Sequence, residues 1–400
     1  MIVKILQINI FGNLSTGRIM VDLAKAITDA GQEAICAFAR NEIEDGINHV
    51  RIGNKFNVYA DGMMTRLTDR AGFFSKSATS KLIDQIKKEN PDIVHLHNLH
   101  GYYINIEILF DFLRNYGKPV VWTLHDCWAY TGHCCYYSSA MCNKWLIGCK
   151  NCSQIKTYPA SFVDQSARNY RDKKRLFTSI PNLTLVTVSK WLEDEVKKSF
   201  LSDNDITTIY NGVDLDIFKP VKSNVIQKYG LPNKKIILGV ASTWSERKGL
   251  LDFVKLSEKL SDDSVVVLLG VSEKQMKSLP NKICALSRTN SLQELVELYS
   301  AADVYFNASV EETFGLPTVE ALACGTPVIV YDKTAVPEVV NKECGYVLDA
   351  HDLDSVVNII ESGEYRQIAP ELCRKQANKY EKKLQYKRYL DLYKKILKEK

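Results

Sequence analysis

Short apolar runs alternate with segments of helical periodicity along the whole chain. A first set of runs lies at 3–10, 33–39, 92–97, 119–126 and 183–189, and helix-like segments such as 18–31 separate them. Parallel strands that are buried on both faces have this near-continuous apolar character, and helices connect them. Ser189 precedes a helix-like segment with acidic residues near its beginning, so we predict that Ser189 caps a helix. The pattern predicts an α/β domain that is complete by about residue 205.

A second set of apolar runs follows at 235–242, 264–271, 303–309, 326–332 and 345–349. Between the two sets, the segment 208–220 contains the turn dipeptide Asn211-Gly212 and ends in Pro220, which indicates a linker. From about Glu371 the chain is rich in Lys and Tyr, with apolar residues at helical spacing. This predicts one long amphipathic helix with an apolar stripe that must pack on something. We therefore expect domains at 1–210 and 211–376 and a terminal helix at 377–400.

Two doubly wound domains in series place their ligand-binding loops at the carboxyl ends of the strands, where we expect the two sheets to face each other across a cleft. The 400 residues suffice for two cores, and 46% hydrophobic with 25% charged residues is typical of globular proteins. The net charge of +5 is small, and neither half carries the basic excess of a nucleic-acid-binding protein. We expect no nucleic-acid partner, although contact with an anionic membrane surface is compatible with the first half.

Polar residues and cysteines indicate the compartment. Lys4, Gln7 and Asn9 interrupt the first apolar run, and no small-residue cleavage site follows, so a buried strand is a better interpretation than a signal peptide. The later run 265–271 is far shorter than the ~20 residues of a membrane-spanning helix. Six of the eleven cysteines crowd into 127–152, whereas a disulfide-stabilised secreted fold would spread them. We predict a cytoplasmic protein with one cysteine-rich insert.

The segment 311–320 carries the most informative chemistry. Glu312 and Glu320 are eight residues apart, with Gly315 between them and Pro317 in a position typical of a first helical turn. Such a loop offers backbone N–H groups and a positive helix end to a phosphate, and a carboxylate can accept two hydrogen bonds from a ribose diol. The same residues also suit an ordinary helix start that is stabilised by acidic side chains. Local physics leaves these two interpretations open.

The pattern Glu312-x7-Glu320 and its surroundings, EETFGLPTVEALACGTPVI, resemble the signature of the retaining glycosyltransferases of family 4, which have the GT-B fold. The resemblance extends over most of the chain and includes the turn 15–18, WTLHDCWAYTG, TVSKW, NGVDLDIF, the loop 247–249 and ELYSAADVYFNAS. It is strongest to bacterial enzymes of capsule, colanic-acid-type and O-antigen synthesis. It implies two Rossmann-like domains and a terminal helix that crosses back onto the first domain.

The resemblance also implies roles for residues of the second half. Arg247 and Lys248 would neutralise the diphosphate of a nucleotide-sugar donor, although by spacing alone they look like solvated surface cations. Glu312 would bind the hydroxyls of the donor sugar, and Glu320 the ribose. The backbone N–H groups of Phe314, Gly315 and Leu316 would assist in binding the sugar. The end of the strand near Arg288 would contact the base.

The first half would supply the acceptor side of the site. Gly17 and Arg18 lie where the first strand turns into a helix, at which a glycine lets the acceptor or the donor phosphate approach. His125 and Asp126 end a strand at the cleft, and His125 matches the family's histidine near the donor sugar. We interpret His97 as a further lining residue, and His95 and His100 as structural. A lone histidine more often satisfies a hydrogen bond of the core.

No residue has the pattern of a covalent nucleophile, so the resemblance implies same-face, retaining, metal-independent transfer in which the enzyme supplies orientation and electrostatics. A two-step route through a carboxylate is the alternative. The expected acceptor is a saccharide, in particular a polyprenyl-diphosphate-linked oligosaccharide, which would place the protein at the inner face of the cytoplasmic membrane. A nucleotide-sugar 2-epimerase of the same fold and an inactive carbohydrate-binding scaffold are the alternatives to a hexosyltransferase.

The cysteine-rich insert contains a Cys-x2-Cys pair and two more thiols, a set that suits a structural zinc site. The four cysteines are Cys134, Cys142, Cys149 and Cys152. Similar cysteines occur in the enzymes that the chain resembles, with His133 replacing a usual glycine and Cys135 standing where a histidine is common. Disulfides or buried free thiols are the alternatives. Such a zinc would have no open coordination position and no part in catalysis, for which no cofactor is expected.

Overall fold

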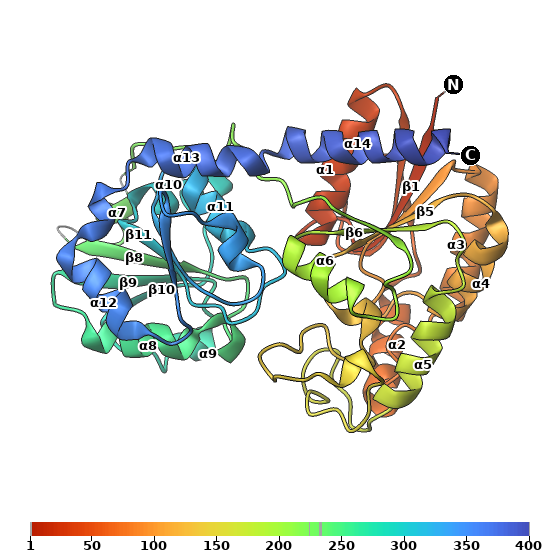
Figure 1. Cartoon of the computed structure of the whole chain (residues 1–400), viewed down its shortest axis with the longest axis horizontal. Coiled ribbons are helices and arrows are strands. Elements are labelled where there is room, and N and C mark those ends of the chain that lie inside the picture. The colour runs from red at the N-terminus through yellow and green to blue at the C-terminus, as the bar shows by residue number, and fades with distance from the viewer. Residues whose placement is uncertain (1, 224, 232–233, 400) are drawn as a thin grey trace. The chain divides into compact units, whose positions relative to one another are not determined.

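The computed structural model describes residues 2–223, 225–231 and 234–399 (Figure 1). By its internal contacts the chain divides into two compact units. The first consists of Met1–Tyr210 together with Tyr386–Lys400, and the second of Asn211–Gln385. Residues 377–385, which the sequence assigned to the terminal helix, therefore cluster with the second unit.

The first unit is built on a parallel sheet of seven strands in the order β3-β2-β1-β4-β5-β6-β7. The order reverses between β1 and β4, and this is the switch point at which such sheets bind ligands. The strands are β1 (Lys4–Phe11), β2 (Glu33–Arg40), β3 (His49–Arg51), β4 (Ile93–Leu96), β5 (Val120–Leu124), β6 (Leu183–Thr187) and β7 (Asp205–Thr208). Their helices are α1 (Thr16–Asp29), α2 (Lys55–Thr68), α3 (Lys76–Glu89), α4 (Ile106–Tyr116), α5 (Ser166–Phe177) and α6 (Lys190–Lys197), with short turns η1 (Trp128–Tyr130) and η2 (Lys144–Leu146).

The second unit is built on a parallel sheet of six strands in the order β10-β9-β8-β11-β12-β13. The strands are β8 (Lys235–Val240), β9 (Ser264–Leu269), β10 (Ile283–Leu286), β11 (Val304–Asn307), β12 (Val328–Tyr331) and β13 (Gly345–Leu348). The helices are α7 (Val225–Lys228), α8 (Leu250–Lys259), α9 (Glu273–Met276), α10 (Leu292–Ala301), α11 (Leu316–Ala323), α12 (Leu353–Ser362) and α13 (Pro370–Ala377), with turns η3 (Glu246–Lys248), η4 (Val336–Val339), η5 (Glu364–Gln367) and η6 (Asn378–Tyr380).

Both sheets have the α/β, doubly wound arrangement that the sequence pattern predicted, and this fold class is confirmed. The predicted cap is also confirmed, because Ser189 Oγ accepts a hydrogen bond from the N–H of Leu192 at 3.1 Å at the start of α6. Among the described residues, no helix is both long enough and apolar enough to cross a membrane.

The terminal segment is not the single helix that was predicted from Glu371. It consists of α13, η6 and α14 (Lys382–Lys398), with Glu381 in an extended conformation between the last two. The backbone around Glu381 pairs with Val213 of the linker: Val213 N donates to Tyr380 O at 2.8 Å, and Lys382 N donates to Val213 O at 3.0 Å. These hydrogen bonds replace the helical ones and interrupt the helix, which side-chain periodicity alone does not reveal.

The apolar stripe of α14 packs into the core of the first unit, as Figure 1 shows for the blue helix near the N-terminal strand. Three tyrosines of the stripe, Tyr386, Tyr389 and Tyr393, are at most 5% exposed. They join a core formed by strands and by α1. The chain's last helix is therefore an integral part of the unit that its first strand begins.

Candidate functional site

The loop between β11 and α11 forms the amino-terminal end of a helix. Gly315 has a φ of +93° and is the N-cap of α11, and Pro317 lies in its first turn. This left-handed conformation favours glycine, and no heavy atom lies within 3.4 Å of where a Cβ would stand, so conformation rather than crowding requires Gly315. Phe314 is buried against Tyr380. The helix start predicted near Pro317 is confirmed, and N–H groups of its first turn, near Leu316, have no intrahelical acceptor.

Lys248 and Glu312 form an ion pair in the second unit. Lys248 Nζ donates to Glu312 Oε1, and Ser309 Oγ donates to the same oxygen at 3.1 Å. Both charged side chains are largely buried, at 18% and 14% exposed. The N–H of Glu312 donates to Thr334 Oγ1 at 2.9 Å, which fixes the backbone that carries the carboxylate. A cation and a carboxylate 64 residues apart in sequence are thus one cluster.

Arg247 joins this cluster through the turn that carries both cations. Gly249, with a φ of +77°, follows the turn, and a Cβ there would lie 2.3 Å from the carbonyl oxygen of Ala308. Glycine therefore allows the turn to lie against the end of β11. Arg247 Nη1 donates to the backbone oxygen of Glu311 at 2.6 Å. The solvated-surface interpretation of Arg247 and Lys248 is wrong for this structure, because both are partly buried and hydrogen-bonded.

The charge state of Glu312 follows from its neighbours. Burial alone would raise the pKa of Glu312, but the positive charge of Lys248, and then that of Arg247, outweigh it and hold the pKa below its ordinary value. Glu312 is therefore ionised at neutral pH. Lys248 and Arg247 bring two positive charges to a place of low exposure, where a cation attracts an anionic ligand more strongly than it does in water.

Glu320 lies in α11 beside a buried tyrosine. Tyr299 Oη donates to Glu320 Oε2 at 2.9 Å, and Tyr299 is fully buried. The backbone oxygen of Tyr299 accepts from Thr326 Oγ1 at 2.6 Å, so the tyrosine is itself held in place. One oxygen of the Glu320 carboxylate is therefore fixed in direction, as binding of a diol requires.

Arg288 follows β10 and is exposed. Close to it in sequence, Ser287 lines a hollow at the carboxyl ends of β8, β9 and β10. Small and hydroxyl-bearing residues line much of this hollow, including Ser242, Thr243, Gly270 and Ser272. It lies at the edge of the sheet where open α/β folds bind ligands.

In the first unit, Gly17 and Arg18 begin α1 after β1. A Cβ on Gly17 would lie 2.7 Å from the backbone oxygen of Phe11, so close packing of the helix on the strand requires this glycine. The glycine is thus required by helix packing, whereas the sequence had suggested that it lets a ligand approach. Arg18 is exposed, and among the described residues its side chain has no hydrogen-bond or ion-pair partner. An exposed cation at a helix start at the sheet's switch point suits an anion.

Histidines and the terminal helix meet inside this unit. His95 Nδ1 lies 2.6 Å from Tyr393 Oη, and its Nε2 lies 2.8 Å from Thr123 Oγ1. His97 Nδ1 lies 3.1 Å from His125 Nε2, and His97 is 1% exposed. With His125 and Asp126 it lines a small cavity beside the ends of β4 and β5. Burial lowers the pKa of His95 to about 3 and that of His125 to about 4. At neutral pH, His125 is therefore an uncharged hydrogen-bonding group.

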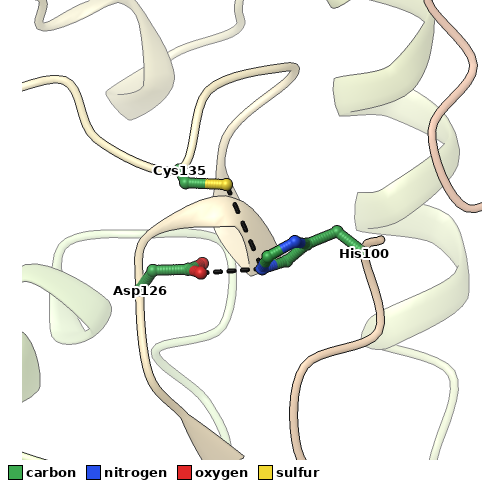
Figure 2. Close-up of side chains that lie close together, drawn as sticks. All are labelled: His100, Asp126 and Cys135. Atoms are coloured by element: carbon green, nitrogen blue, oxygen red, sulfur yellow. Dashed lines mark hydrogen bonds and ion pairs between the residues drawn. The ribbon is translucent and has the colours of Figure 1, made fainter. Parts of the chain in front are cut away.

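Asp126 has protein donors on both carboxylate oxygens. His100 Nε2 donates to Oδ2 at 2.7 Å (Figure 2). The N–H of Trp128 donates to Oδ1 at 2.9 Å. Burial opposes ionisation, but the adjacent His100 holds the pKa of Asp126 below its ordinary value. Cys135 Sγ lies 4.0 Å from the same Nε2. The Cys135 thiol and the Asp126 carboxylate both approach Nε2 of His100, so the imidazole cannot take a proton on one nitrogen and pass it on from the other. The role of Asp126 here is therefore to position His100.

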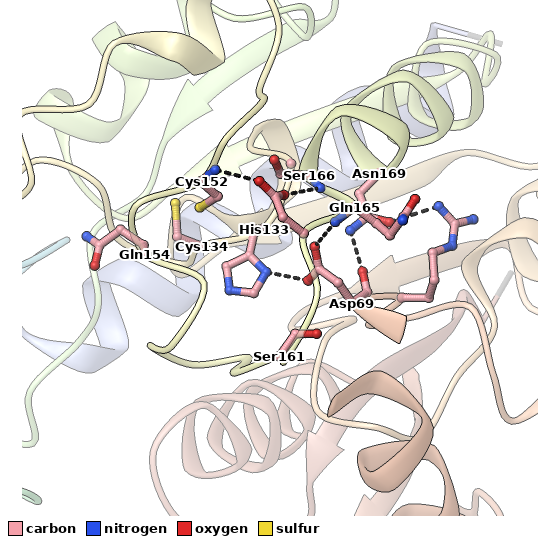
Figure 3. Close-up of polar contacts among 12 residues, drawn as sticks. Asp69, His133, Cys134, Cys152, Gln154, Ser161, Gln165, Ser166 and Asn169 are labelled. Atoms are coloured by element: carbon pink, nitrogen blue, oxygen red, sulfur yellow. Dashed lines mark hydrogen bonds and ion pairs between the residues drawn. The ribbon is translucent and has the colours of Figure 1, made fainter. Parts of the chain in front are cut away.

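The cysteine-rich insert is fixed to the unit by a buried pair of a histidine and an aspartate. His133 Nδ1 bonds to Asp69 Oδ1, and both side chains are 1% exposed (Figure 3). Burial lowers the pKa of His133, but Asp69 outweighs it and raises the pKa above its ordinary value. The second Asp69 oxygen accepts from the N–H of Gln165 at 2.7 Å. Lys173, fully buried beneath the insert, donates to the backbone oxygen of Trp128 at 2.7 Å.

All eleven cysteines are free thiols, so the disulfide alternative does not describe this structure. Cys134 and Cys152 share a hydrogen bond, which lowers the pKa of Cys152 to about 7, and the N–H of Gly132 donates to Cys149 Sγ at 3.1 Å. Within 2–223, 225–231 and 234–399, however, the group with ligand atoms within 4.8 Å of one another is His100, Asp126 and Cys135. The four thiols are near one another without that spacing, and zinc would require their side chains to turn together.

Metal analysis tests the zinc prediction. Protein purified without chelator should contain about one zinc per chain, because four thiolates form a closed tetrahedral site. Replacing Cys149 and Cys152 by serine should abolish the zinc and lower the melting temperature. Cys284→Ser, outside the insert and also partly exposed, is the control that should retain it. Metal-free protein with unchanged stability on chelation would contradict a structural zinc and leave free thiols.

Several supporting residues escaped sequence reasoning. Tyr299 and Ser309 donate to the two carboxylates, and Thr334 accepts from the backbone N–H of Glu312. Each of the three comes from a different loop or helix and carries no motif. Thr334 has a φ of +51°, which is uncommon for a residue other than glycine and is not encoded in the pattern of apolar positions. A hydroxyl-bearing residue has no sequence motif of its own, so its role becomes apparent only when the fold brings it to its partner.

Comparison with known proteins covers both units. Residues 16–217 match the family described as Glycosyltransferase Family 4, and residues 221–382 match the family described as Glycosyl transferases group 1. The chain is 24% identical over 278 residues to the colanic acid biosynthesis glycosyl transferase WcaC of Escherichia coli K12, covering 67% of each. It is 32% identical over 173 residues to the O-antigen chain mannosyltransferase RfbU of Salmonella typhimurium LT2, covering 41% of this chain and 46% of that protein.

Solved structures share the fold. A glycosyltransferase from Rickettsia africae ESF-5 superposes with a TM-score of 0.71 at 19% identity, covering 100% of both chains. Anabaena Alr3699/HepE, in complex with UDP and glucose, gives a TM-score of 0.70 at 16% identity, covering 98% of this chain and 100% of that one. At this identity the likeness concerns the fold, and the expected two-domain fold class is confirmed by it.

Proposed function

The chain belongs to the glycosyltransferases of family 4, and from this premise we propose that it is a retaining hexosyltransferase of surface-polysaccharide synthesis. Its donor would be a nucleotide-diphosphate sugar, and its acceptor a saccharide, in particular a polyprenyl-linked oligosaccharide. Relatives named for colanic acid and O-antigen synthesis support the polysaccharide. A relative named as a processive diacylglycerol glucosyltransferase supports a lipid-borne acceptor. Such an acceptor would place the enzyme in the cytoplasm, at the inner face of the membrane.

The observation that carries the proposal is the buried cluster of Lys248, Arg247 and Glu312. A diphosphate leaving group gains negative charge as the bond to the sugar breaks, and two cations in a place of low exposure stabilise that charge more than they stabilise the intact donor. Their positions are already fixed by hydrogen bonds to Glu312 and to the backbone of Glu311, so little reorganisation is needed. The cations therefore meet the electrostatic need of the leaving group, and we propose transfer independent of a metal ion.

The rest of the donor would lie along the same edge of the sheet. Glu312 would accept hydrogen bonds from the sugar hydroxyls, and N–H groups at the start of α11 would face the phosphate. The fixed carboxylate of Glu320 would accept from the ribose diol. The hollow beside Arg288 would hold the base, and it contains hydroxyl and backbone groups that suit more than one base. The neighbour HepE is described with UDP, and a uridine nucleotide is accordingly the first donor to test here.

The first unit would supply the acceptor side. Arg18 would contact an anionic group of the acceptor or donor at the start of α1. His125 would hydrogen-bond the sugar as a neutral imidazole, since burial disfavours the second ring proton, which would make the imidazole positively charged, at pH 7. Asp126 would act through His100, which it orients, and Gly17 through the close approach of α1 to β1.

We propose that transfer occurs on one face of the sugar, with the acceptor hydroxyl hydrogen-bonded to the departing phosphate. Glu312 is already engaged by Lys248 and Ser309, which reduces its nucleophilicity and disfavours the two-step route through a glycosyl-enzyme. The contributions of the protein would then be orientation, with reacting atoms at roughly 3–3.5 Å, and charge stabilisation.

Transfer of radiolabelled sugar tests the function directly. The purified protein is given a panel of UDP-, GDP- and ADP-sugars with a polyprenyl-diphosphate-linked saccharide acceptor, and labelled lipid-linked product is expected from one donor. Conversion of the nucleotide sugar itself, with no transfer, would instead identify an epimerase. Saccharide binding without turnover of any donor would identify an inactive scaffold.

A further inference from the structure

Helix α2 carries a row of exposed apolar side chains. Phe56, Tyr59, Met63 and Leu67 are spaced at i, i+3, i+7 and i+11, which at 100° per residue places them within an arc of about 80° on one side of the helix. Their exposed fractions are 77%, 77%, 61% and 52%. Single exposed apolar residues are ordinary on a protein surface, but a continuous row on one helix face marks a surface that contacts something.

The side of α2 that faces the protein is polar. Asp61 and Thr65 are 2% and 0% exposed and lie on the opposite side of the helix from the apolar row. Thr65 Oγ1 donates to Asp61 Oδ1 at 3.3 Å, and Ser75 Oγ donates to Asp61 Oδ2 at 2.6 Å. A surface helix of a globular protein normally buries its apolar side and exposes its polar side. In α2 the order is reversed, so its apolar side is available to a partner outside the unit.

The loop after the cysteine-rich insert extends this surface. Phe162 is 73% exposed, and its N–H donates to the backbone oxygen of Arg66 in the last turn of α2 at 2.8 Å. The Arg66 guanidinium lies 5.8 Å from the centre of the Phe162 ring. In Figure 1, α2 lies beside the yellow loops that follow β5. We call the set Phe56, Tyr59, Met63, Leu67 and Phe162 the α2 apolar face.

The exposed charged residues of helix α2 are both basic, whereas the loop that carries Phe162 also exposes the acidic Asp164. Lys55 and Arg66 are the exposed charged residues of α2, while its acidic residue, Asp61, is buried. Apolar side chains with basic neighbours on one exposed helix face are typical of a helix that lies in the interface of an anionic lipid bilayer. A second copy of the chain, meeting this face with its own, would bring the basic residues together.

We propose that the α2 apolar face docks the protein on an anionic lipid bilayer. The aromatic and methionine side chains would enter the region between headgroups and acyl chains, and Lys55 and Arg66 would contact the phosphates. The proposed function enters this inference only as the reason for docking, which would bring the first unit to a lipid-borne acceptor. Docking itself requires no donor.

Vesicle co-sedimentation of the full chain tests the surface. The protein should bind vesicles of equal parts phosphatidylglycerol and phosphatidylcholine, and bind phosphatidylcholine vesicles more weakly. The triple variant Phe56→Ser, Tyr59→Ser, Met63→Ser should lower the partition coefficient by roughly tenfold or more, since that apolar area no longer leaves water. Lys55→Glu with Arg66→Glu should remove the preference for the anionic vesicles.

Single substitutions matched in exposure provide the control. Met63→Ser should weaken binding, whereas Ile2→Ser, at 62% exposed against 61%, should not. Circular dichroism and melting temperature establish that each variant is folded, and nucleotide binding without vesicles should be unchanged in all of them. Equal binding of wild type and triple variant would overturn the proposal. So would a wild-type dimer that the triple variant converts to a monomer without any vesicle binding. Loss of nucleotide binding with vesicle binding retained would contradict the proposed function instead.

Discussion

Replacing Lys248 by alanine is expected to lower turnover by about 10²–10³-fold at saturating donor, the range found when a group that stabilises developing negative charge is removed. Ground-state affinity for the nucleotide sugar should fall much less, because the charge on the diphosphate increases as the bond breaks. The measurement is steady-state transfer, which separates kcat from KM, together with the dissociation constant of the donor measured by calorimetry.

The same substitution should change the pH dependence. With Lys248 present, the pKa of Glu312 lies below its ordinary value, so the carboxylate stays ionised as the pH falls. Without Lys248, burial is opposed mainly by Arg247, and the pKa of Glu312 should rise. The acidic limb of the residual activity should therefore move to higher pH. It follows that stability drawn from the ionised Glu312, present above its unfolded pKa, would be lost at a higher pH on acidification than in the wild type.

Lys255→Ala is the matched control, since it removes the same charge from an exposed position of α8, the helix that follows Lys248. It should leave kcat and the pH profile unchanged. Lys248→Arg should restore part of the activity if charge is the main contribution. Normal turnover of Lys248→Ala at saturating donor would show that the ion pair with Glu312 is only structural.

Much of the fold is encoded locally. Each apolar run of the sequence became a strand because a parallel sheet covered by helices buries both faces, so the run itself is the signal. The capping hydroxyl of Ser189 and the start of α11 at Gly315 and Pro317 were also predictable, since they depend on neighbours within a few residues. The break at Glu381 was not, because the residue that pairs with the backbone on both sides of it, Val213, lies 168 positions earlier in the sequence.

Site residues that belong to a sequence motif were predictable. Site residues that reach the site only through long-range contacts were not. The motif indicated Lys248, Glu312 and Glu320, but not that Lys248 and Glu312 would be bonded to each other before any ligand is present. Tyr299 has no sequence signal for its contact with Glu320. A residue whose role depends on one long-range hydrogen bond is apparent only in the structure.

Helix α2 shows the limit of periodicity most clearly. Phe56, Tyr59, Met63 and Leu67 have the spacing that normally predicts a core-facing stripe. Periodicity gives the width of an apolar face but not the direction in which it points. The buried contacts of Asp61 determine that direction, because they turn the polar side inward.

Replacing Glu320 by alanine is expected to weaken nucleotide binding by about 5- to 150-fold, which corresponds to the roughly 1–3 kcal/mol lost when a buried polar partner is left unsatisfied. The loss should appear equally for the nucleotide diphosphate and for its sugar, because the ribose is common to both. Tyr299→Phe keeps the carboxylate and removes only the hydroxyl that holds Oε2, so it should have a smaller effect in the same direction. Glu297→Ala, a nearby carboxylate of α10, is the control that should bind normally. Isothermal calorimetry gives the affinities, and melting temperatures establish that each variant is folded. Unchanged affinity of a folded Glu320→Ala variant would show that the ribose is bound elsewhere.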